Sequence, residues 1–347
     1  MSEQIGTKAL QQAERPLPDE VIPYGWYHVG WSAELNAEDV VPLAYFDRHL
    51  VMYRGTSGEV HVLDAHCAHL GAHMGYGGKV SCEDIVCPFH GWRWNHEGEN
   101  VEVPYSDRPS ARRIGAWPVA ERNGCIFVWY HPQGGEPLSE PPVMEEESPD
   151  SYFPVHPDGA MLWSVTFPPQ YAAENLVDFA HFKYVHAAAT AATLEGFEVQ
   201  GPHFTSVLGL LMGEGKESTW MTPTGPTPAK LVTRVFGPGV NTVRFEVSRP
   251  GIADVIVMTA VTPETLSPCK GDLRISILVR AEDLSGQGRD PAWVASRWYA
   301  EERRQVDQDV MIWNNMRYLE KAPFPPSEFK AFNAMRRWSR QFYLVER

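Results

Sequence analysis

Two short segments, each with one cysteine and one histidine, constrain the fold of this chain more than any other feature. The first has the pattern Cys-x-His, with Cys67 and His69, and the second has the pattern Cys-x-x-His, with Cys87 and His90. Thiolate and imidazole groups in paired loops are metal ligands by residue type. Because 17 residues separate His69 from Cys87, the chain must fold back to bring both segments to one metal centre.

Two kinds of centre use two cysteines and two histidines. One is a tetrahedral zinc site, and the other is a Rieske [2Fe–2S] centre, in which histidines replace cysteines on one iron. The spacing favours the second kind, because each segment can give its cysteine to one iron and its histidine to the other. We expect Gly71 and Gly91 to turn the two loops. The remaining cysteines are expected to be ordinary buried thiols: Cys82, Cys125 and Cys269.

A second group of possible metal ligands lies between Asn175 and His186. Asp178 and His181 are three residues apart, so they share one face if the segment is helical. His181 and His186 are five residues apart, which is about 140° around a regular helix. These two histidines can bind one ion only if the helix bulges or ends between them. Otherwise they are not ligands of the same ion.

A carboxylate would complete the two-histidine, one-carboxylate triad of non-haem Fe(II) sites. In the helix predicted near the C-terminus, Asp309 lies about 60° from Val306, at the edge of the apolar stripe. Asp307 lies about 100° from Val306 on the other side of the stripe. Asp309 is therefore the better inward carboxylate. Glu302 also falls near the stripe and remains a rival.

The chain divides into four parts by composition. Short β-branched and aromatic runs predict an all-β unit, with a hairpin at residues 55–58. Its strands are expected at 41–46, 50–54, 60–63 and 125–130. Prolines, glycines and acids in 132–150 predict a linker. The predicted parts are an N-terminal arm (1–20), an all-β domain (21–135), a linker (136–152) and a second domain (153–347).

The second domain is predicted to be α+β. A helix is expected to begin after Pro168 and Pro169 and to run through His181. Consecutive strands without helices between them imply an antiparallel sheet. These strands are expected at 207–212, 230–236, 241–247, 255–261 and 273–279. A long helix should begin at Pro291, capped by Asp290, and continue to about residue 319.

Composition excludes several classes of protein. The chain has 30 Lys and Arg against 44 Asp and Glu, and its net charge of -14 argues against a nucleic-acid binder. No apolar run approaches the ~20 residues that span a bilayer, and residues 1–20 lack the apolar core of a signal sequence. Five cysteines in 347 residues are too few for a disulfide scaffold, which favours the cytoplasm.

The order of the two ligand groups is typical of a known family. The Cys/His segments precede an Asn-x-x-Asp-x-x-His-x-x-x-x-His motif, formed here by Asn175, Asp178, His181 and His186. The chain resembles the oxygenase component of Rieske non-haem iron oxygenases. It resembles the 3-ketosteroid 9α-hydroxylase oxygenase group most and the cholesterol 7-desaturases more loosely. The matching stretches are 174–186, 308–313, 336–338 and 341–343.

This resemblance implies an N-terminal Rieske domain with a [2Fe–2S] cluster, a C-terminal helix-grip domain with mononuclear Fe(II), and a ring-shaped homotrimer. It implies His181, His186 and Asp309 as the iron ligands. Asp178 would bridge a Rieske histidine of one subunit to an iron-ligand histidine of the next, and Asn175 is the other candidate catalytic residue.

The predicted function is that of a terminal oxygenase, which uses O2 to hydroxylate an apolar polycyclic substrate that is steroid-like. The chain lacks a Gly-x-Gly-x-x-Gly dinucleotide fingerprint, so electrons from NAD(P)H should arrive through a separate reductase or a ferredoxin. Oxidative O- or N-demethylation of an aromatic compound is the alternative enzyme function. A Rieske electron carrier is less favoured because of the second ligand group, and a zinc-stabilised binding module is the remaining class.

Overall fold

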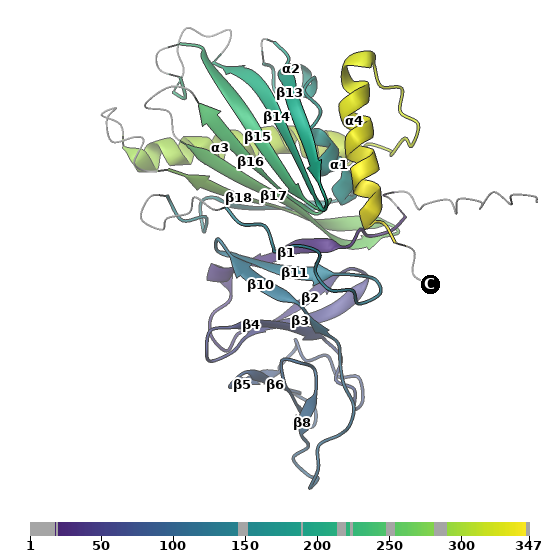
Figure 1. Cartoon of the computed structure of the whole chain (residues 1–347). Helices are drawn as coiled ribbons and strands as arrows, with labels where there is room; N and C mark the ends of the chain where they lie inside the picture. Colours follow the sequence, from purple (N-terminus) through teal and green to yellow (C-terminus); the bar gives the residue numbers. More distant parts are fainter. Residues whose placement is uncertain are drawn as a thin grey trace, which may run out of the picture.

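The computed structural model describes residues 18, 20–144, 152–188, 190–213, 220–222, 225–247, 254–280 and 290–344. Most of the predicted arm (1–20) lies outside the described residues, and so does the 145–151 part of the predicted linker. The first part of the chain forms small sheets, and the second part forms one large sheet with helices (Figure 1).

The first part of the chain is all-β, as predicted. Its antiparallel sheets have the orders β1-β11-β10, β2-β3-β4-β9 and β5-β6-β7-β8. The predicted hairpin is confirmed, since residues 55–58 lie in the turn between β3 and β4. The strands are β1 (Gly25–Trp31), β2 (Val40–Tyr45), β3 (Arg48–Arg54), β4 (Val60–Asp64), β5 (Lys79–Ser81), β6 (Asp84–Val86), β7 (Arg93–Trp94), β8 (Asn100–Glu102), β9 (Ala116–Trp117), β10 (Val119–Arg122) and β11 (Cys125–Tyr130).

The second part is a seven-stranded antiparallel sheet with helices, which confirms the predicted α+β class. The strand order is β12-β18-β17-β16-β15-β14-β13. The strands are β12 (Ala160–Val165), β13 (Thr193–Gln200), β14 (His203–Met212), β15 (Thr227–Phe236), β16 (Val240–Val247), β17 (Val255–Leu266) and β18 (Cys269–Val279). The helices are α1 (Pro169–Asn175), α2 (His181–Tyr184), α3 (Pro291–Trp313) and α4 (Pro326–Ser339).

Alternate side chains of the central strand β17 face two different partners. Val257 belongs to a buried cluster that includes Val306 of α3. Its neighbours Ile256 and Met258 belong instead to the core that β1 and β11 share with the sheet. Because side chains alternate across a strand, one sheet joins the helices on one face to the first part of the chain on the other.

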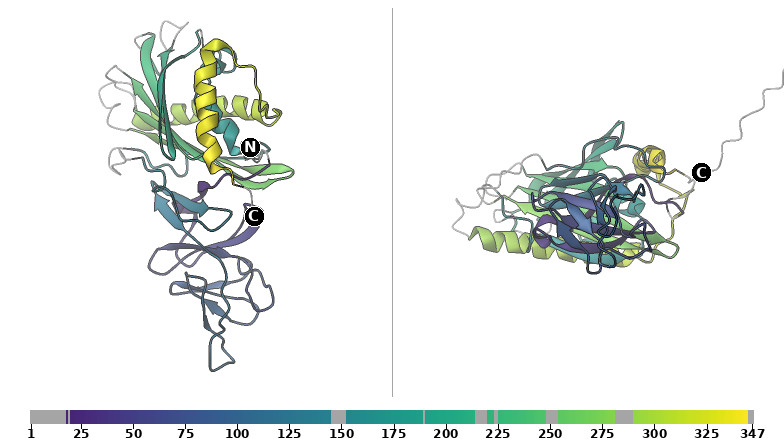
Figure 2. Two further views of the ribbon diagram at one scale, coloured as in Figure 1. Left: turned by 45° about the vertical axis from the view of Figure 1, so that its right-hand side comes forward. Right: turned by 90° about the horizontal axis from the view of Figure 1, so that it is seen from below.

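Polar contacts also join the first part of the chain to β18. The indole nitrogen of Trp31 donates to Ser276 Oγ (2.9 Å), and the hydroxyl of Tyr45 donates to Asp272 Oδ2 (2.5 Å). Arg274, which is buried, donates to the same carboxylate (3.1 Å), so its charge is paired. The sheet β5-β6-β7-β8 forms the end of the molecule that lies far from α2 and α3 (Figures 1 and 2).

The prediction of one helix that begins after Pro168 and Pro169 and runs through His181 is wrong, because the chain forms two helices there. α1 ends at Asn175 and α2 begins at His181. Between them, the carboxylate of Asp178 accepts the amide N–H groups of Ala180 and His181 (3.1 and 3.2 Å). Short polar side chains compete with helical hydrogen bonds in this way. The segment from 176 to 180 is therefore a turn.

α3 begins at Pro291 with Asp290 as its N-cap, as predicted, but it ends at Trp313 and not near residue 319. The next residue, Asn314, accepts the amide N–H of Thr166 through Oδ1 (2.7 Å), and asparagine is a weak helix former. The strands β12 and β13 and the helix α4 were not predicted from the sequence. Among the described residues, no helix is long and apolar enough to cross a bilayer.

A bidentate ion pair should stabilise the contact between α1 and α4. Arg336 donates to both carboxylate oxygens of Glu174 (2.9 and 2.8 Å), and each side chain is only 12% exposed. Arg336→Ala would leave a buried carboxylate without its partner, so we expect a loss of about 3 kcal/mol in the free energy of unfolding by urea. Arg337, one residue further along α4, is exposed, and Arg337→Ala should change this free energy little. Equal effects of the two substitutions would contradict this assignment.

Candidate metal centres

The two Cys/His loops share one backbone geometry. The amide of Gly71 donates to the carbonyl of Cys67 (2.9 Å), and the amide of Gly91 donates to the carbonyl of Cys87 (3.1 Å). In each loop the cysteine amide donates to the carbonyl five residues later (2.9 and 2.8 Å). Gly71 and Gly91 have φ values of 77° and 71°, which favour glycine, so these residues turn the loops as the sequence predicts.

The four predicted cluster ligands lie together, with the cysteines inside and the histidines outside. Cys67 and Cys87 are 2% and 3% exposed, whereas His69 and His90 are half-buried, with ring centroids 4.6 Å apart. Nδ1 of His69 is buried and has no hydrogen-bond partner among the described residues. A histidine nitrogen that binds a metal has no hydrogen-bond partner when only the protein atoms are considered, so this observation is what a metal ligand would show. These residues fit a [2Fe–2S] centre.

The remaining cysteines are not alike. Cys125 is buried, as predicted. Cys82 is exposed, in a turn between β5 and β6 with a φ of 57°, so the prediction of a buried thiol is wrong there. Cys269 is partly exposed. None of the described cysteines forms a disulfide.

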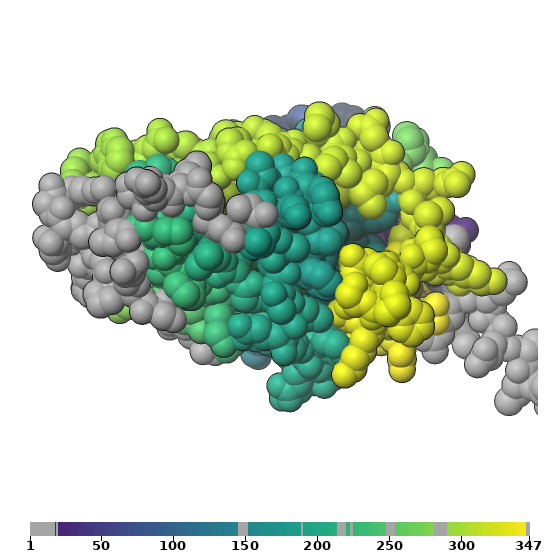
Figure 3. Space-filling model, turned by 90° about the horizontal axis from the view of Figure 1, so that it is seen from above, coloured from purple at the N-terminus to yellow at the C-terminus, as the bar shows by residue number. Residues whose placement is uncertain are grey.

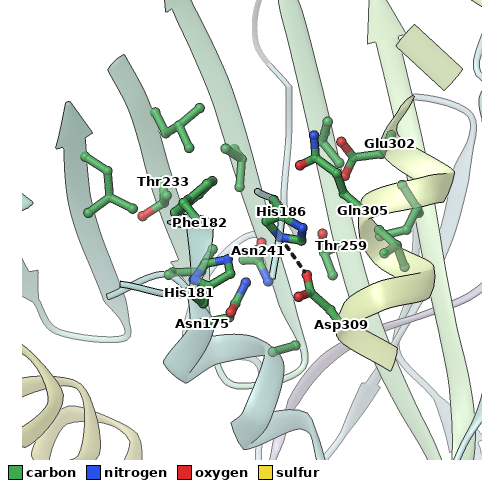
Figure 4. A pocket seen from close by; sticks show the side chains of 18 of the residues that line it. Asn175, His181, Phe182, His186, Thr233, Asn241, Thr259, Glu302, Gln305 and Asp309 are labelled. Atoms are coloured by element: carbon green, nitrogen blue, oxygen red, sulfur yellow. Dashed lines mark ion pairs between the residues drawn. The ribbon is translucent and has the colours of Figure 1, made fainter. Parts of the chain in front are cut away.

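The second ligand group forms where α2 meets α3 (Figure 4). His181 is the first residue of α2, which ends at Tyr184, so a helix does end before His186, as one of the sequence alternatives requires. One ligand atom from each of His181, His186 and Asp309 lies within 4.8 Å of the others. Two imidazoles and a carboxylate at this spacing fit the triad of a non-haem iron.

Hydrogen bonds orient both histidines toward this point. Nδ1 of His181 donates to the carbonyl oxygen of Asp178 (2.5 Å), and Nδ1 of His186 donates to Oε1 of Gln308 (3.1 Å). Each ring therefore keeps Nε2 as a ligand atom. Gln308 was missed as a positioning residue by the sequence analysis. Its only sequence signal is its place beside Asp309.

Asp309 gives the site its negative charge. Its carboxylate is buried, and Oδ2 lies 3.5 Å from Nε2 of His186. Burial lowers the pKa of His186, but the hydrogen bond and charge of Asp309 outweigh burial and raise that pKa above its usual value. A carboxylate that stabilises a proton at this position also stabilises a metal cation there.

The two rival carboxylates have other surroundings. Asp307 is exposed, and its Oδ1 accepts the indole N–H of Trp163 (2.8 Å). Glu302 lines the same cavity as Asp309, but burial and the charge of Asp309 raise the pKa of Glu302 to about 7. Glu302 is also not one of the three residues whose ligand atoms lie within 4.8 Å of one another. Of the three carboxylates, the structure brings Asp309 to the histidines.

The sequence suggests that Asp178 is a carboxylate buried in an apolar helix, and the structure differs on both points. It lies in the turn between α1 and α2, and a third of its side chain is exposed (33%). Burial raises the pKa of Asp178, but hydrogen bonds from His181 and from two backbone amides outweigh it and lower that pKa. Asp178 is therefore an anion beside an iron-ligand candidate. Asn175, at the end of α1, lines the adjoining cavity.

The cavity beside the triad lies between the sheet and α1, α2 and α3. It contains about 740 Å³ of space free of protein atoms, part of which is open to solvent. Its sheet side is apolar except for Thr233, Asn241 and Thr259 (Figure 4). Asn241 is 2% exposed, and its Oδ1 has no partner among the described residues. Seen from above, the teal surface around α2 lies between the yellow-green surface of α3 and the yellow surface of α4 (Figure 3).

Two family matches together cover most of the chain. Residues 25–119 match the family described as "Rieske [2Fe-2S] domain", and residues 128–343 match "3-Ketosteroid 9alpha-hydroxylase C-terminal domain". The two matches contain every ligand candidate described above. The expected cofactors, a [2Fe–2S] cluster and a mononuclear iron, agree with these families and with the His/Asp group in the structure.

Individual proteins support the same relationship. A cholesterol 7-desaturase from Xenopus laevis is 30% identical over 347 residues, which is 93% of this chain and 72% of the relative. The oxygenase component of 3-ketosteroid-9-alpha-monooxygenase from Rhodococcus rhodochrous is 28% identical, over 92% of this chain and 83% of the relative. Apo dicamba monooxygenase has the same fold, with a TM-score of 0.67, 18% identity, and coverage of 93% of this chain and 97% of the other.

Substitution of either candidate cluster cysteine should remove the [2Fe–2S] centre. In Cys67→Ser and Cys87→Ser one thiolate ligand is lost, so we expect the visible absorption of the cluster and its inorganic sulfide to disappear. Cys82→Ser, at an exposed cysteine, is the matched control and should keep both signals. A cluster that survives in either buried-cysteine variant would refute the ligand assignment.

Substitution of the second group should remove one iron per chain and leave the cluster spectrum unchanged. We expect this result for His181→Ala, His186→Ala and Asp309→Ala, measured by metal analysis and visible absorption. Asp307→Ala and Glu302→Gln should keep the iron, because neither side chain belongs to the group of three. If Glu302→Gln loses the iron and Asp309→Ala keeps it, the carboxylate ligand is Glu302.

Proposed function

Because the chain belongs to the Rieske oxygenase family with the 3-ketosteroid 9alpha-hydroxylase C-terminal domain, we propose that it hydroxylates an apolar, steroid-like substrate with O2. It is a Rieske-type monooxygenase by family. One observation carries the proposal beyond the family: the triad of His181, His186 and Asp309 opens into a cavity whose sheet wall is mostly apolar, so an apolar substrate held there would lie beside the iron ligands.

The proposed site residues have separate tasks. Cys67, Cys87, His69 and His90 hold the cluster, and His181, His186 and Asp309 hold the iron. When bound, the cluster supplies single electrons and the iron supplies open positions where O2 is activated. The chain's own part is to fix both histidine rings through Asp178 and Gln308, and to present an apolar sheet wall to the substrate.

The substrate proposal rests on the cavity and on the relatives. The wall formed by the sheet consists of Leu, Val, Ile and Phe side chains apart from the three polar ones. An apolar ring system fits this surface, and a single hydroxyl group would donate to Oδ1 of Asn241, which has no partner among the described residues. The named relatives act on cholesterol and on 3-ketosteroids, which are compounds of this kind. We therefore propose a role in steroid metabolism.

Electrons should come from outside the chain. An oxygenase component depends on a reductase or a ferredoxin as its partner. Within one chain, the cluster loops lie toward the end of the molecule that is far from α2 and α3 (Figure 1). We propose a homotrimer in which Asp178, partly exposed, meets the cluster histidines of a neighbouring subunit. The exposed Leu70 and Phe89, beside His69 and His90, would lie in that contact.

The division of the chain and its location are proposals too. The match at 25–119 lies within the all-β domain that we propose at 21–135, and the match at 128–343 contains most of the catalytic domain that we propose at 153–347. An arm at 1–20 and a linker at 136–152 complete the proposed division. Cysteines that form no disulfide are typical of reducing compartments, so we propose a cytoplasmic protein.

Product mass distinguishes this function from its alternative. The protein, loaded with both metals, should be supplied with NADH, a reductase and a ferredoxin, and offered cholesterol, a 3-ketosteroid and O- or N-methylated aromatic compounds. We expect a steroid product that has gained one oxygen. Loss of two hydrogens would mean desaturation. Loss of a methyl group from an aromatic compound, with no steroid product, would replace our proposal by oxidative demethylation.

Asp178→Asn should separate electron transfer from metal binding. The asparagine oxygen can still accept the amides of Ala180 and His181, so the turn and both metals should persist, but the charge is lost. We expect normal reduction of the cluster and a fall in oxygenation by orders of magnitude. The measurement is rapid mixing of reduced protein with substrate and O2, following cluster reoxidation. Asp307→Asn, at an exposed carboxylate of α3, is the control. Product-coupled reoxidation at the wild-type rate would leave Asp178 only a structural role.

A further inference from the structure

Trp94 has an indole N–H that no oxygen or nitrogen accepts. The residue is the last of β7, its side chain is fully buried, and Nε1 has no hydrogen-bond partner among the described residues. A buried polar group of this kind costs free energy unless something accepts its hydrogen. The indole N–H of Trp94 is therefore either an unsatisfied donor or a donor to an acceptor other than oxygen and nitrogen.

Other tryptophans in the described chain do find oxygen acceptors. Trp92, two residues before, donates to the hydroxyl of Tyr105 (2.7 Å), and Trp117 donates to the carboxylate of Asp64 (3.0 Å). Trp94 is the one described tryptophan with a buried Nε1 that lacks such a partner. Its ring cannot turn to find one, because it is packed on all sides in the core around the candidate cluster.

The core that encloses Trp94 contains cysteine sulfurs that can act as acceptors. The same buried core contains Cys67 and Cys87. Of these two cysteines, Cys67 is the one on which the Trp94 indole acts as a donor, and in the protein alone this contact does not reach hydrogen-bond geometry. A thiol sulfur accepts hydrogen bonds weakly, but a metal-bound cysteine is a thiolate and accepts them strongly.

We propose that Trp94 donates a hydrogen bond from Nε1 to the thiolate of Cys67 in the cluster-loaded protein, and that this bond raises the reduction potential of the [2Fe–2S] centre. Reduction adds one electron and makes the cluster more negative, while the proton stays on the indole nitrogen. A donor aimed at a cluster sulfur stabilises the more negative state, because hydrogen bonds to the sulfurs set the potential. The inference rests on the cluster assignment and is independent of the substrate.

Trp94→Phe tests the bond, because phenylalanine keeps an aromatic ring in the core and removes the N–H. In a redox titration of the full-length, cluster-loaded protein, the ratio of oxidised to reduced cluster at a fixed potential should rise about tenfold. This corresponds to a midpoint lower by about 59 mV for a one-electron couple. Trp117→Phe also removes an N–H, but one that serves Asp64, and should change the ratio less than twofold. No shift in Trp94→Phe, or equal shifts in both variants, would overturn the proposal.

A second measurement leaves Trp94 unchanged, so it does not require a Trp94 variant to fold. Protein labelled with ¹⁵N only at the tryptophan indoles, in the Trp92→Phe background, should show an indole ¹⁵N coupling in the pulsed EPR spectrum of the reduced cluster. Its absence would mean that Nε1 of Trp94 does not contact a cluster ligand, and the proposal would fail. A protein without a cluster would instead contradict the cluster assignment itself.

Discussion

The carboxylate of Asp178 is the contact on which the catalytic half of the molecule depends. By accepting the amides of Ala180 and His181, it separates α1 from α2. In one continuous helix His181 and His186 would point about 140° apart. Because α2 ends at Tyr184, His186 lies beyond the helix and both rings turn toward Asp309. Asp178 itself fixes the ring of His181, since its carbonyl oxygen accepts the N–H at Nδ1. The same residue thus shapes the iron site and carries the charge proposed for electron transfer.

The two candidate metal centres are built by different physical means. The cluster loops use local backbone geometry, with a glycine at positive φ closing each turn, so the site is almost complete within residues 67–92. The iron site is non-local, because Asp309 reaches it only when α3 packs on the sheet through Val306 and Val310. Damage to the packing of α3 should therefore affect the iron more than the cluster.

This difference explains what could be predicted from the sequence. Ligand types and short spacings indicated the cluster loops, and the angle between Asp309 and Val306 on a helix was enough to prefer Asp309 over Asp307. The break at Asp178 was missed, because helical periodicity does not reveal a side chain that bonds to the backbone. Gln308 and Trp94 were missed because their partners, His186 and Cys67, are remote in sequence.

The central claim is that electrons stored in the cluster activate O2 at the triad and place one oxygen atom in a steroid held beside it. The most direct measurement is a single turnover of fully reduced protein with a steroid and ¹⁸O2, in the absence of any external electron donor. We predict a hydroxylated product that carries one ¹⁸O atom and forms as the cluster is reoxidised. Reoxidation without labelled product, or a product whose oxygen comes from water, would contradict this account.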